Sequence, residues 1–595
     1  MLVSLRIGRV SVVCLMFVLV CPARVAEGGQ IVLWECATDS GCVATHATPP
    51  GYIHGLGFMI AGGAVGDFNN DGWEDLYIVS GGTAPDRLYI NQSGSFVNQS
   101  TAWGITSAHM GAGVAVGDYN NDGWLDIFVA SYGPTGGPMS IGQHRLLRNN
   151  AGTGFTNVAV AAGVNWSDTT INAFGAAFGD YDLDGDLDLY ITGWRTGASS
   201  AGGNRLFRNN GNGTFTDVTL AAGLHESTLH GFAVRFVDMN GDRYPEILVA
   251  GDFYSSRYYV NNTDGTFSNQ TAASGAGLDC NGMGTTIGDF DNDGDQDWYV
   301  TNIYRGDTMP SAPCGNRLYL NAGGNLFDEV AEAAGVIDGR WGWGTVAVDL
   351  DQDGRLDIVA DNGYSDSDLG PMQWEDQPKR VYQNNGDLTF TDVAQSAGYT
   401  RTGQGRGVVN FDFDNDGDQD IGVFSFAEPF ELYRNDSINA GNWLRVRLNT
   451  SAVTGLAPNG FGTRLLARTG AFWQTRYVDG GSNYLSQSEL SAHFGLGGAT
   501  FVDELRIEWA DGDVLVEENV AAGQTLVVSA LLRGDANCDG AVSVADIGPF
   551  VTALTDSTGY TALFPDCDVR HADVNSDQRV TVSDIGVFVS LLVGN

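Results

Sequence analysis

Short apolar runs recur along most of the chain, separated by glycine-rich turns and acidic stretches. In one unit, "GAGVAVGD" (residues 111–118) precedes an acidic stretch, "LDIFVA" (125–130) follows it, and "RLLRN" (145–149) comes next. After a glycine-rich turn, a fourth run ends each unit, as in "FTDVTLAAG" (215–223). The units repeat every 51 to 63 residues. Four short strands per repeat predict a β-propeller with one four-stranded blade per unit.

The acidic stretch between the first two runs is a nonamer that occurs seven times, so we expect seven blades. Oxygen-bearing side chains stand at positions 1, 3, 5 and 9, and six copies have glycine at position 6. Glycine tolerates a sharp turn with positive φ, which lets these oxygens converge. A ring of hard oxygen ligands at flexible coordination number favours calcium, whereas magnesium demands stricter geometry. One such nonamer could be a solvated turn, but seven in the same phase indicate up to seven calcium sites.

The predicted propeller ligands are four side chains in each nonamer. They are Asp67, Asn69, Asp71, Asp75; Asp118, Asn120, Asp122, Asp126; Asp180, Asp182, Asp184, Asp188; Asp238, Asn240, Asp242, Glu246; Asp289, Asp291, Asp293, Asp297; Asp349, Asp351, Asp353, Asp357; and Asp412, Asp414, Asp416, Asp420. The fourth copy differs, with glycine moved to Gly241, Arg243 at position 6 and Glu246 at the end. We expect it to be the weakest site.

The Gly-x-Gly that precedes each nonamer does not indicate a nucleotide site. These glycines come before a strand and acidic residues, and not before a helix N-terminus. We expect them to let the innermost strands crowd around the axis.

The repeats resemble the FG-GAP/VCBS repeats of integrin α-subunit propellers, whose calcium loops read D-x-[DN]-x-D-G-x-x-D. The resemblance covers residues 30–436. Residues 442–530, which include "NGFGTRLLAR" (459–468) and "LRIEWADG" (505–512), resemble the ASPIC/UnbV module that follows such propellers in proteins related to cartilage acidic protein. Their alternating apolar pattern predicts a small β-domain.

The C-terminal residues 533–595 contain two 12-residue acidic loops, each followed by an apolar helical run at 547–554 or 585–592. They resemble a type I dockerin, a small α-helical domain with two EF-hand-like calcium loops. The implied ligands are Asp535, Asn537, Asp539, Ser543, Asp546; and Asp573, Asn575, Asp577, Thr581, Asp584. The resemblance also implies attachment to a cohesin-like partner. Loop positions 10 and 11 differ from the family's Ser-Thr pair, so calcium binding carries over more directly than cohesin binding.

Charge and targeting signals indicate an exported protein. The formal net charge of −42 argues against nucleic acid and anionic membranes as partners. Arg6 and Arg9 precede a 12-residue apolar run, the pattern of a signal peptide over residues 1–26, and no second run approaches the length of a membrane span. A secreted or cell-surface location permits disulfides. The most economical pairing joins cysteines 36–42, 280–314 and 538–567, although six cysteines allow 15 pairings.

The fourth-strand pattern predicts how the ring closes. An apolar residue followed eight positions later by glycine occurs six times, as in Phe96/Gly104. The seventh copy is missing after Asp420 but is present near the N-terminus as Leu33/Gly41. We expect a strand around residues 33–37 to complete the blade that holds 412–420.

No catalytic motif stands out. The eight histidines show no HExxH and no obvious pairing with an acid or serine, and neither GxSxG nor a phosphate-binding loop occurs. The sequence therefore predicts a calcium-loaded scaffold that binds extracellular protein or glycan. The alternative is a polysaccharide-active hydrolase or lyase carried on a propeller.

Overall fold

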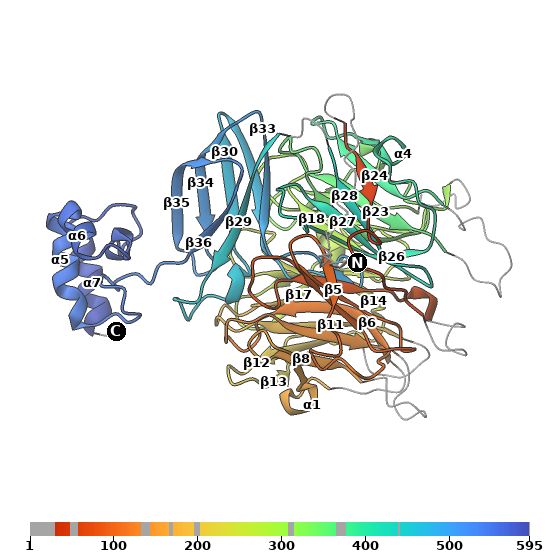
Figure 1. The fold of residues 1–595 in the computed structure, drawn as a ribbon, viewed down its shortest axis with the longest axis horizontal. Helices are drawn as coiled ribbons and strands as arrows, with labels where there is room; N and C mark the ends of the chain where they lie inside the picture. The colour runs from red at the N-terminus through yellow and green to blue at the C-terminus, as the bar shows by residue number, and fades with distance from the viewer. Residues whose placement is uncertain are drawn as a thin grey trace, which may run out of the picture.

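The computed structural model describes residues 30–47, 57–132, 143–165, 171–195, 203–306, 314–364, 377–437 and 441–593. The predicted signal segment lies outside them. The chain is mainly β, as predicted, and its repeated four-stranded sheets form the larger body at the right of Figure 1.

Each repeat folds into an antiparallel sheet whose strands follow chain order. The strands are β2 (Gly63–Gly66), β3 (Asp75–Ile78), β4 (Arg87–Asn91), β5 (Phe96–Asn98); β6 (Gly111–Gly117), β7 (Asp126–Ser131), β8 (Arg145–Asn149), β9 (Phe155–Asn157); β10 (Ile171–Gly179), β11 (Asp188–Arg195), β12 (Arg205–Asn209), β13 (Phe215–Asp217); β14 (Gly231–Val237), β15 (Glu246–Gly251), β16 (Arg257–Asn261), β17 (Phe267–Asn269); β18 (Thr285–Gly288), β19 (Asp297–Val300), β20 (Arg317–Asn321), β21 (Phe327–Glu329); β22 (Gly342–Val348), β23 (Asp357–Asn362), β24 (Arg380–Asn384), β25 (Phe390–Asp392); and β26 (Gly405–Phe411), β27 (Asp420–Ser425), β28 (Glu431–Asn435).

Every acidic nonamer connects the first strand of its sheet to the second. Its ninth residue begins the second strand, so that Gly66 pairs with Asp75 and Gly117 with Asp126. After the fourth strand, four repeats form one helical turn, at α1 (Ala159–Ala162), α2 (Thr271–Ser274), α3 (Ala331–Ala334) and α4 (Ala394–Ala397). A left-handed glycine ends each turn, such as Gly163 with φ 81°.

The first strands surround a common axis. They contact one another in a closed cycle: β2, β6, β10, β14, β18, β22, β26 and again β2. A Cβ added at Gly113 would lie 2.2 Å from the carbonyl oxygen of Phe174 on the neighbouring first strand, and one at Gly344 would lie 2.4 Å from that of Arg406. Glycine is therefore needed there because the strands crowd together, as the sequence predicted. This arrangement is consistent with a propeller.

The N-terminal strand closes the ring, as predicted. Strand β1 (Leu33–Glu35) is the fourth strand of the last sheet, in the order β1-β28-β27-β26. Leu33 pairs with Asn435 and Trp34 with Arg434. Leu33 is buried in the core between the last two repeat sheets.

A second β-domain lies beside the repeat sheets (Figure 1). One sheet has the order β33-β29-β36 and the other β31-β30-β34-β35. The strands are β29 (Asn442–Asn449), β30 (Arg464–Thr469), β31 (Phe472–Tyr477), β33 (Ala492–Gly497), β34 (Phe501–Glu508), β35 (Val514–Ala521) and β36 (Gln524–Ser529). The two sheets share an apolar core that includes Leu444, Phe494 and Leu505.

One segment of this second domain enters the axis of the repeat sheets. Residues 482–488, here called the axial segment, contain β32 (Ser486–Gln487), which pairs in parallel with β2. Tyr484 and Leu485 are fully buried, and the Tyr484 hydroxyl donates to the carbonyl of Met59 (2.9 Å). Backbone or side-chain atoms of the segment also bond to Val234, Thr345, Val116 and Val408, from four other first strands.

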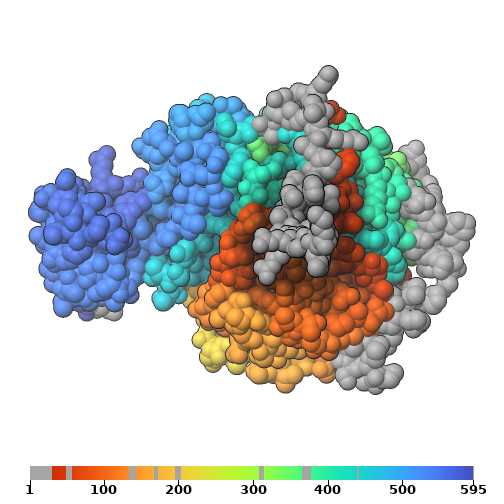
Figure 2. Space-filling view, in the orientation of Figure 1, coloured from red at the N-terminus to blue at the C-terminus, as the bar shows by residue number. Residues whose placement is uncertain are grey.

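The C-terminal residues form a small helical lobe, seen at the left of Figure 2. Its helices are α5 (Ile547–Thr555), α6 (Ser557–Leu563) and α7 (Asp584–Val593), and the rings of Phe550 and Phe588 stack at 4.0 Å. Ion pairs join the lobe to the second domain, from Arg533 to Asp513 (2.9 Å) and from Arg570 to Glu517 (2.8 Å).

Two of the three predicted disulfides form. Cys280 is joined to Cys314 and Cys538 to Cys567. The predicted 36–42 bridge is wrong, because Cys36 and Cys42 remain as buried thiols. A turn closed by the bond from the Cys42 N–H to the Ala37 carbonyl (2.8 Å) places both thiols in an apolar core.

Candidate metal centres

Each nonamer forms a tight loop around the carboxylate of its first residue. In the first copy, the N–H groups of residues five and six donate to Asp67 Oδ1 (3.0 Å) and Oδ2 (2.7 Å). The sixth residue, Gly72, has a φ of 90°. The ninth residue, Asp75, accepts N–H groups from Phe68 (3.0 Å) and Asn91 (2.7 Å). Hydrogen bonds from backbone N–H groups therefore hold the loop carboxylates in place without an ion.

Where the third position is aspartate, the loop gathers three carboxylates. Oxygen atoms lie within 4.8 Å of one another in the groups Asp180, Asp182, Asp188; Asp289, Asp291, Asp297; Asp349, Asp351, Asp353; and Asp412, Asp414, Asp420. Among the described residues, these groups do not include the predicted ligands Asp184, Asp293, Asp416 and Asp357, each of which accepts backbone N–H groups. The remaining three loops have asparagine at position 3, at Asn69, Asn120 and Asn240.

Several buried ligand oxygens in these loops have no hydrogen-bond partner. At position 3 they are Asn120 Oδ1, Asp182 Oδ1, Asp351 Oδ1 and Asp414 Oδ1, and at position 1 Asp289 Oδ1. Leaving a buried polar or anionic oxygen unpaired is costly. Their recurrence at position 3 of four of the seven loops fits a hard cation such as calcium, which binds carboxylate and amide oxygens.

The raised pKa values of the loop carboxylates also favour a bound cation. Burial raises the pKa of Asp75 to about 9 and that of Asp126 to about 8, and neighbouring carboxylates of the same loop add to the rise. Burial also raises the pKa of Asp180 to about 7. A divalent cation would reverse these shifts by favouring the ionised form.

The asparagine that ends each third strand had no predicted role, and the structure gives it one. Its side-chain amide donates to the carbonyl of the second residue in the preceding loop. The seven bonds run from Asn91 to Phe413 (2.7 Å), Asn149 to Phe68 (2.9 Å), Asn209 to Tyr119 (2.8 Å), Asn261 to Tyr181 (2.9 Å), Asn321 to Met239 (2.7 Å), Asn384 to Phe290 (2.9 Å) and Asn435 to Leu350 (2.9 Å).

The same asparagines also hold their own loops. The backbone N–H of Asn209, for example, donates to Asp188, the ninth residue of its loop (2.8 Å). Each asparagine thus touches two successive loops, one through its backbone and one through its side chain. Neighbouring candidate ion sites are linked all the way around the ring.

The fourth loop keeps the backbone pattern of the others despite its divergent sequence. The N–H of Arg243 donates to Asp238 Oδ2 (2.8 Å), and Glu246 accepts the N–H of Met239 (2.9 Å). Arg243 has a φ of 77°, and its guanidinium donates to the carbonyl of Ala510 (3.4 Å) in the second domain. The arginine side chain therefore binds the second domain, at the cost of a strained backbone.

The second domain contacts several loops directly. Arg445 pairs with Asp412 (3.1 Å), Arg447 with Glu74 (2.6 Å), and Arg464 donates to the carbonyl of Gly294 (2.5 Å). His493 Nε2 lies 2.9 Å from the carbonyl oxygen of Gly417. These contacts place the domain over the loop face of the repeat sheets.

A cavity of about 470 Å³ separates the second domain from the first two loops. Its lining includes Asp67 and Asn70 of the first loop, Asp118 and Asn121 of the second, and residues 447–451 of the second domain. This cavity is lined by both polar and apolar side chains, among them Leu125, Leu448 and Val453, and lies against two candidate ion sites.

The two C-terminal loops also have ordered ligand positions. Asp535 accepts the N–H groups of Asp539 (3.1 Å) and Gly540 (2.9 Å), and Asp546 accepts those of Asn537 (3.0 Å) and Ser543 (2.8 Å). The second loop repeats this pattern: Asp573 accepts from Asp577 and Gln578, and Asp584 accepts from Asn575 and Thr581. Gln578, which replaces the expected glycine, has a φ of 66°.

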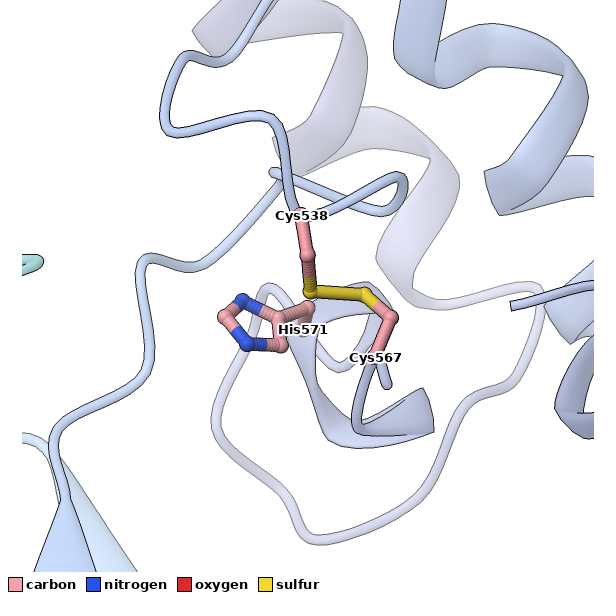
Figure 3. Close-up of side chains that lie close together, drawn as sticks. All are labelled: Cys538, Cys567 and His571. Atoms are coloured by element: carbon pink, nitrogen blue, oxygen red, sulfur yellow. A yellow bond between two sulfur atoms is a disulfide. The ribbon is translucent and has the colours of Figure 1, made fainter. Parts of the chain in front are cut away.

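Cys538, Cys567 and His571 lie close together but do not form a metal site. Figure 3 shows the two sulfur atoms joined and the imidazole beside the bond. A disulfide sulfur is not a thiolate ligand, and His571 Nδ1 lies 2.8 Å from the carbonyl oxygen of Leu532. The bridge instead ties the first acidic loop of the lobe to the turn before η5 (Val569–Ala572).

The structure pairs one histidine with an acid and a serine, which sequence spacing did not show. His109 Nε2 lies 2.6 Å from Ser131 Oγ, and Nδ1 lies 3.6 Å from Asp86 Oδ2. However, Nε2 also lies 2.7 Å from the carbonyl oxygen of Gln143. A carbonyl only accepts, so Nε2 carries a proton and cannot take one from Ser131. All three side chains are buried, which fits a structural role.

Family models match two parts of the chain. An FG-GAP-like repeat matches residues 67–129, 196–249 and 238–300, an FG-GAP repeat matches 110–152, and ASPIC and UnbV matches 454–531. The chain therefore contains FG-GAP repeats and an ASPIC/UnbV domain, as predicted.

The chain is homologous to cartilage acidic protein 1. It is 24% identical to the Xenopus tropicalis protein over 496 residues and 25% identical to the Homo sapiens protein over 491 residues. Each alignment covers 78% of this chain and 63% or 62% of the relative, so the chain spans less than two thirds of these relatives. This homology and the two disulfides fit an extracellular location. In the described part of the chain, no helix is long and apolar enough to cross a membrane.

Solved structures resemble the chain only distantly. The BP39L lectin from Burkholderia pseudomallei is 12% identical with a TM-score of 0.40, covering 64% of this chain and 97% of the lectin chain. The biofilm matrix protein Bap1 of V. cholerae is 14% identical with a TM-score of 0.29, covering 70% of this chain and 60% of that one. Both TM-scores are below 0.5, so neither bears on function.

Proposed function

We propose that this chain is a secreted calcium-loaded scaffold that binds an extracellular protein or glycan. It is a seven-bladed propeller with up to seven calcium ions, joined to the ASPIC/UnbV domain and to a dockerin-like tail with two more. The observation that carries this proposal is the set of buried, unpartnered side-chain oxygens at position 3 of four of the seven loops.

Calcium is favoured over other ions by the donor set. Each loop offers carboxylate and amide oxygens with neither imidazole nor thiol, which disfavours zinc. The ligands come from a flexible loop and number more than magnesium usually takes from protein. When bound, the ion would neutralise the loop carboxylates, while the third-strand asparagine and the loop backbone orient them.

Ligand binding is proposed at the cavity between the second domain and the first two loops. Its lining mixes carboxylates and amides with the Arg447 guanidinium, which suits the hydroxyl and carboxylate groups of a glycan or an acidic peptide. The central axis, by contrast, is filled by the axial segment. A filled axis favours binding at the loop face over catalysis in a central channel.

The tail is proposed to attach the protein to a cohesin-like partner. Its two loops share one hydrogen-bond pattern, and apolar side chains stay exposed beside each loop, at Val544, Ile547 and Val551 and at Val582, Ile585 and Val589. Such exposed apolar patches mark interaction sites. The test is calorimetry with cohesin modules in calcium, in which Val544→Asp combined with Val582→Asp should abolish binding. A wild-type tail that binds no cohesin would reject this part of the proposal.

Calcium binding and ligand binding are tested separately. Native mass spectrometry should count up to nine ions in the wild type, and a chain that takes up none refutes the proposal. A glycan and protein array should then show calcium-dependent ligands that Ser451→Trp, which fills the cavity, no longer binds. Thr500→Trp is the matched control, because Thr500 is exposed on the same domain outside the cavity lining.

A further inference from the structure

The only lysine of the chain, Lys379, is fully buried between two carboxylates that are also fully buried. Its Nζ lies 3.1 Å from Asp361 Oδ2 and 3.0 Å from Glu431 Oε2. Asp361 is on β23, Lys379 precedes β24, and Glu431 begins β28 of the next sheet. The register of β23 and β24, in which Ala360 pairs with Arg380, places Asp361 opposite Lys379.

The fold does not require lysine here. Five other repeats place a hydrogen-bond acceptor at the same position, just before the third strand. In each of these repeats, the side chain at this position accepts a backbone N–H from near the end of the second strand. The pairs are Asp86 with Ser80 (2.9 Å), His144 with Ser131 (3.1 Å), Asn204 with Gly193 (3.1 Å), Ser256 with Gly251 (2.9 Å) and Asn316 with Asn302 (2.9 Å). An ammonium group cannot accept. In the sixth repeat, Asp361 accepts the corresponding N–H of Asn362 instead (2.8 Å).

The surroundings of Lys379 exclude water and hold Glu431 in place. The Tyr399 ring lies 5.4 Å from Nζ, and the Tyr433 hydroxyl donates to Glu431 Oε2 (2.7 Å). Arg401 lies 3.4 Å from the other oxygen, Oε1. Three buried charges without bulk solvent are expensive to maintain. A reaction that converts these three groups into a neutral amide and a protonated carboxyl would therefore be favoured in this site.

We propose that Lys379 and Asp361 become joined by an intramolecular amide bond, with Glu431 as the proton carrier. Glu431 takes a proton from the Lys379 ammonium group, and the Nζ lone pair attacks Cγ of protonated Asp361. The Cγ–O bond to the hydroxyl group then breaks, and the oxygen leaves as water after it gains a proton. The products are one amide, one water and a protonated Glu431, so atoms and charge balance without an oxidant or co-reactant.

Burial and mutual charge set the protonation states of the three groups. Burial raises the pKa of Asp361 to about 6, which populates the acid form that can lose water. Burial lowers the pKa of Lys379, but Asp361 and Glu431 outweigh it and raise the pKa overall. Burial alone would raise the pKa of Glu431, but Lys379, the Tyr433 hydroxyl and Arg401 lower it overall. Lys379 and Glu431 therefore rest as an ion pair, and neutral amine forms only by transient transfer of the proton to Glu431.

The cross-link would join adjacent strands at the base of the connection formed by residues 362–378. The test is peptide mapping of the full chain, expressed and kept in calcium, with a protease that cuts after glutamate. Cleavage after Glu375 separates Asp361 from Lys379, so an amide bond leaves the two segments joined, with a loss of about 18 Da for the water released. Two separate segments overturn the proposal, even if one has lost water internally as a cyclic imide.

A pair of variants and a labelling experiment test the cross-link independently of the peptide map. The cross-link should be absent in Glu431→Gln and present in Glu428→Gln, the matched control, because Glu428 lies nearby but makes no contact with Lys379 that would carry its proton. If Glu431→Gln does not fold, the wild type alone still decides. In the denatured wild-type chain, an amine-reactive ester should label only the N-terminus, whereas labelling of Lys379 would overturn the proposal.

Discussion

The side-chain amide of Asn91 donates a 2.7 Å hydrogen bond to the backbone carbonyl of Phe413, across the junction between the last repeat and the first. These residues are more than 300 positions apart in the sequence, yet their bond is equivalent to the six that join sequential repeats. The ring is therefore closed at the level of its acidic loops as well as by strand β1.

Replacing one of these asparagines should affect two loops. Asn209→Ala removes the bonds to the carbonyls of Tyr119 (2.8 Å) and Leu187 (3.0 Å), both buried. Leaving them unpaired should lower the free energy of unfolding by about 2–4 kcal/mol and weaken calcium binding at the loops of Asp118 and Asp180. Chemical denaturation and calcium titration measure the two effects. Asn210→Ala, at the exposed neighbour, is the control, and equal behaviour of the two variants would contradict the linkage.

Removing calcium should destabilise the whole protein. Loops of this kind in extracellular modules bind calcium at about 10⁻⁴–10⁻³ M, so 2 mM calcium should add up to about 2 kcal/mol per loop by mass action. Scanning calorimetry with calcium and with excess chelator measures the shift in the thermal midpoint, and magnesium serves as the control ion. A midpoint that does not respond to chelation would refute the proposed role of the ions.

The fourth loop should bind calcium last, because Arg243 adds a positive charge and holds a positive φ. Arg243→Gly removes both, whereas Arg243→Ala removes only the charge. We expect the calcium affinity of the fourth loop to rise from the wild type to Arg243→Ala and again to Arg243→Gly. The two variants should differ by about 1 kcal/mol, because glycine adopts a positive φ without strain. Calorimetric titration checks the order. If the wild-type loop already fills together with that of Asp289, the expectation is wrong.

Ring closure should depend on Leu33. It is buried between the last two repeat sheets, so Leu33→Ala should cost about 2–4 kcal/mol, and deletion of residues 30–42 should destabilise the entire ring. Chemical denaturation measures both, with exposed Thr38→Ala as the control. Leu33→Ala as stable as Thr38→Ala would show that β1 contributes little.

Acid sensitivity should arise partly at His144. Burial lowers its pKa to about 3, so between pH 6.5 and 3 the unfolded chain binds more protons than the folded one, and stability falls as the pH falls. This amounts to about 2 kcal/mol at pH 5. His144→Asn should remove that loss, because Asn204 and Asn316 make the equivalent bond in other repeats. Chemical denaturation of the wild type and of His144→Asn at pH 7 and pH 5 measures the loss of stability in each protein. The contributions of all other titrating groups cancel in the difference between the two proteins. Equal losses of stability in both would contradict the assignment to His144.

The repeat architecture was predictable because its signals are local. Apolar runs, turn glycines and acidic nonamers recur in phase, so strand order within each sheet followed directly. The N-terminal strand was also predictable, since Leu33 and Gly41 supply the one copy of the fourth-strand pattern missing elsewhere.

The features that were missed depend on distant partners. The asparagine at each third-strand end was visible, but its acceptor lies 80 to 94 residues earlier in six repeats and 322 residues later for Asn91. Tyr484 and Leu485 are two apolar residues in a polar stretch, and nothing in that spacing indicates burial in the axis of another domain. Cys36 and Cys42 are near in sequence, yet the turn between them directs both thiols into the core without joining them.

The axial segment also makes the repeat sheets and the second domain depend on each other. The first strands of the ring direct backbone donors and acceptors at residues 482–488, which lie within the ASPIC/UnbV match of residues 454–531. A recombination event between the two regions would leave the ring with an unfilled centre and the other module with an exposed Tyr484 and Leu485. The two regions therefore complete each other's cores and form one structural unit. During synthesis, the ring likewise cannot reach its final state until about 50 further residues after its last strand have emerged.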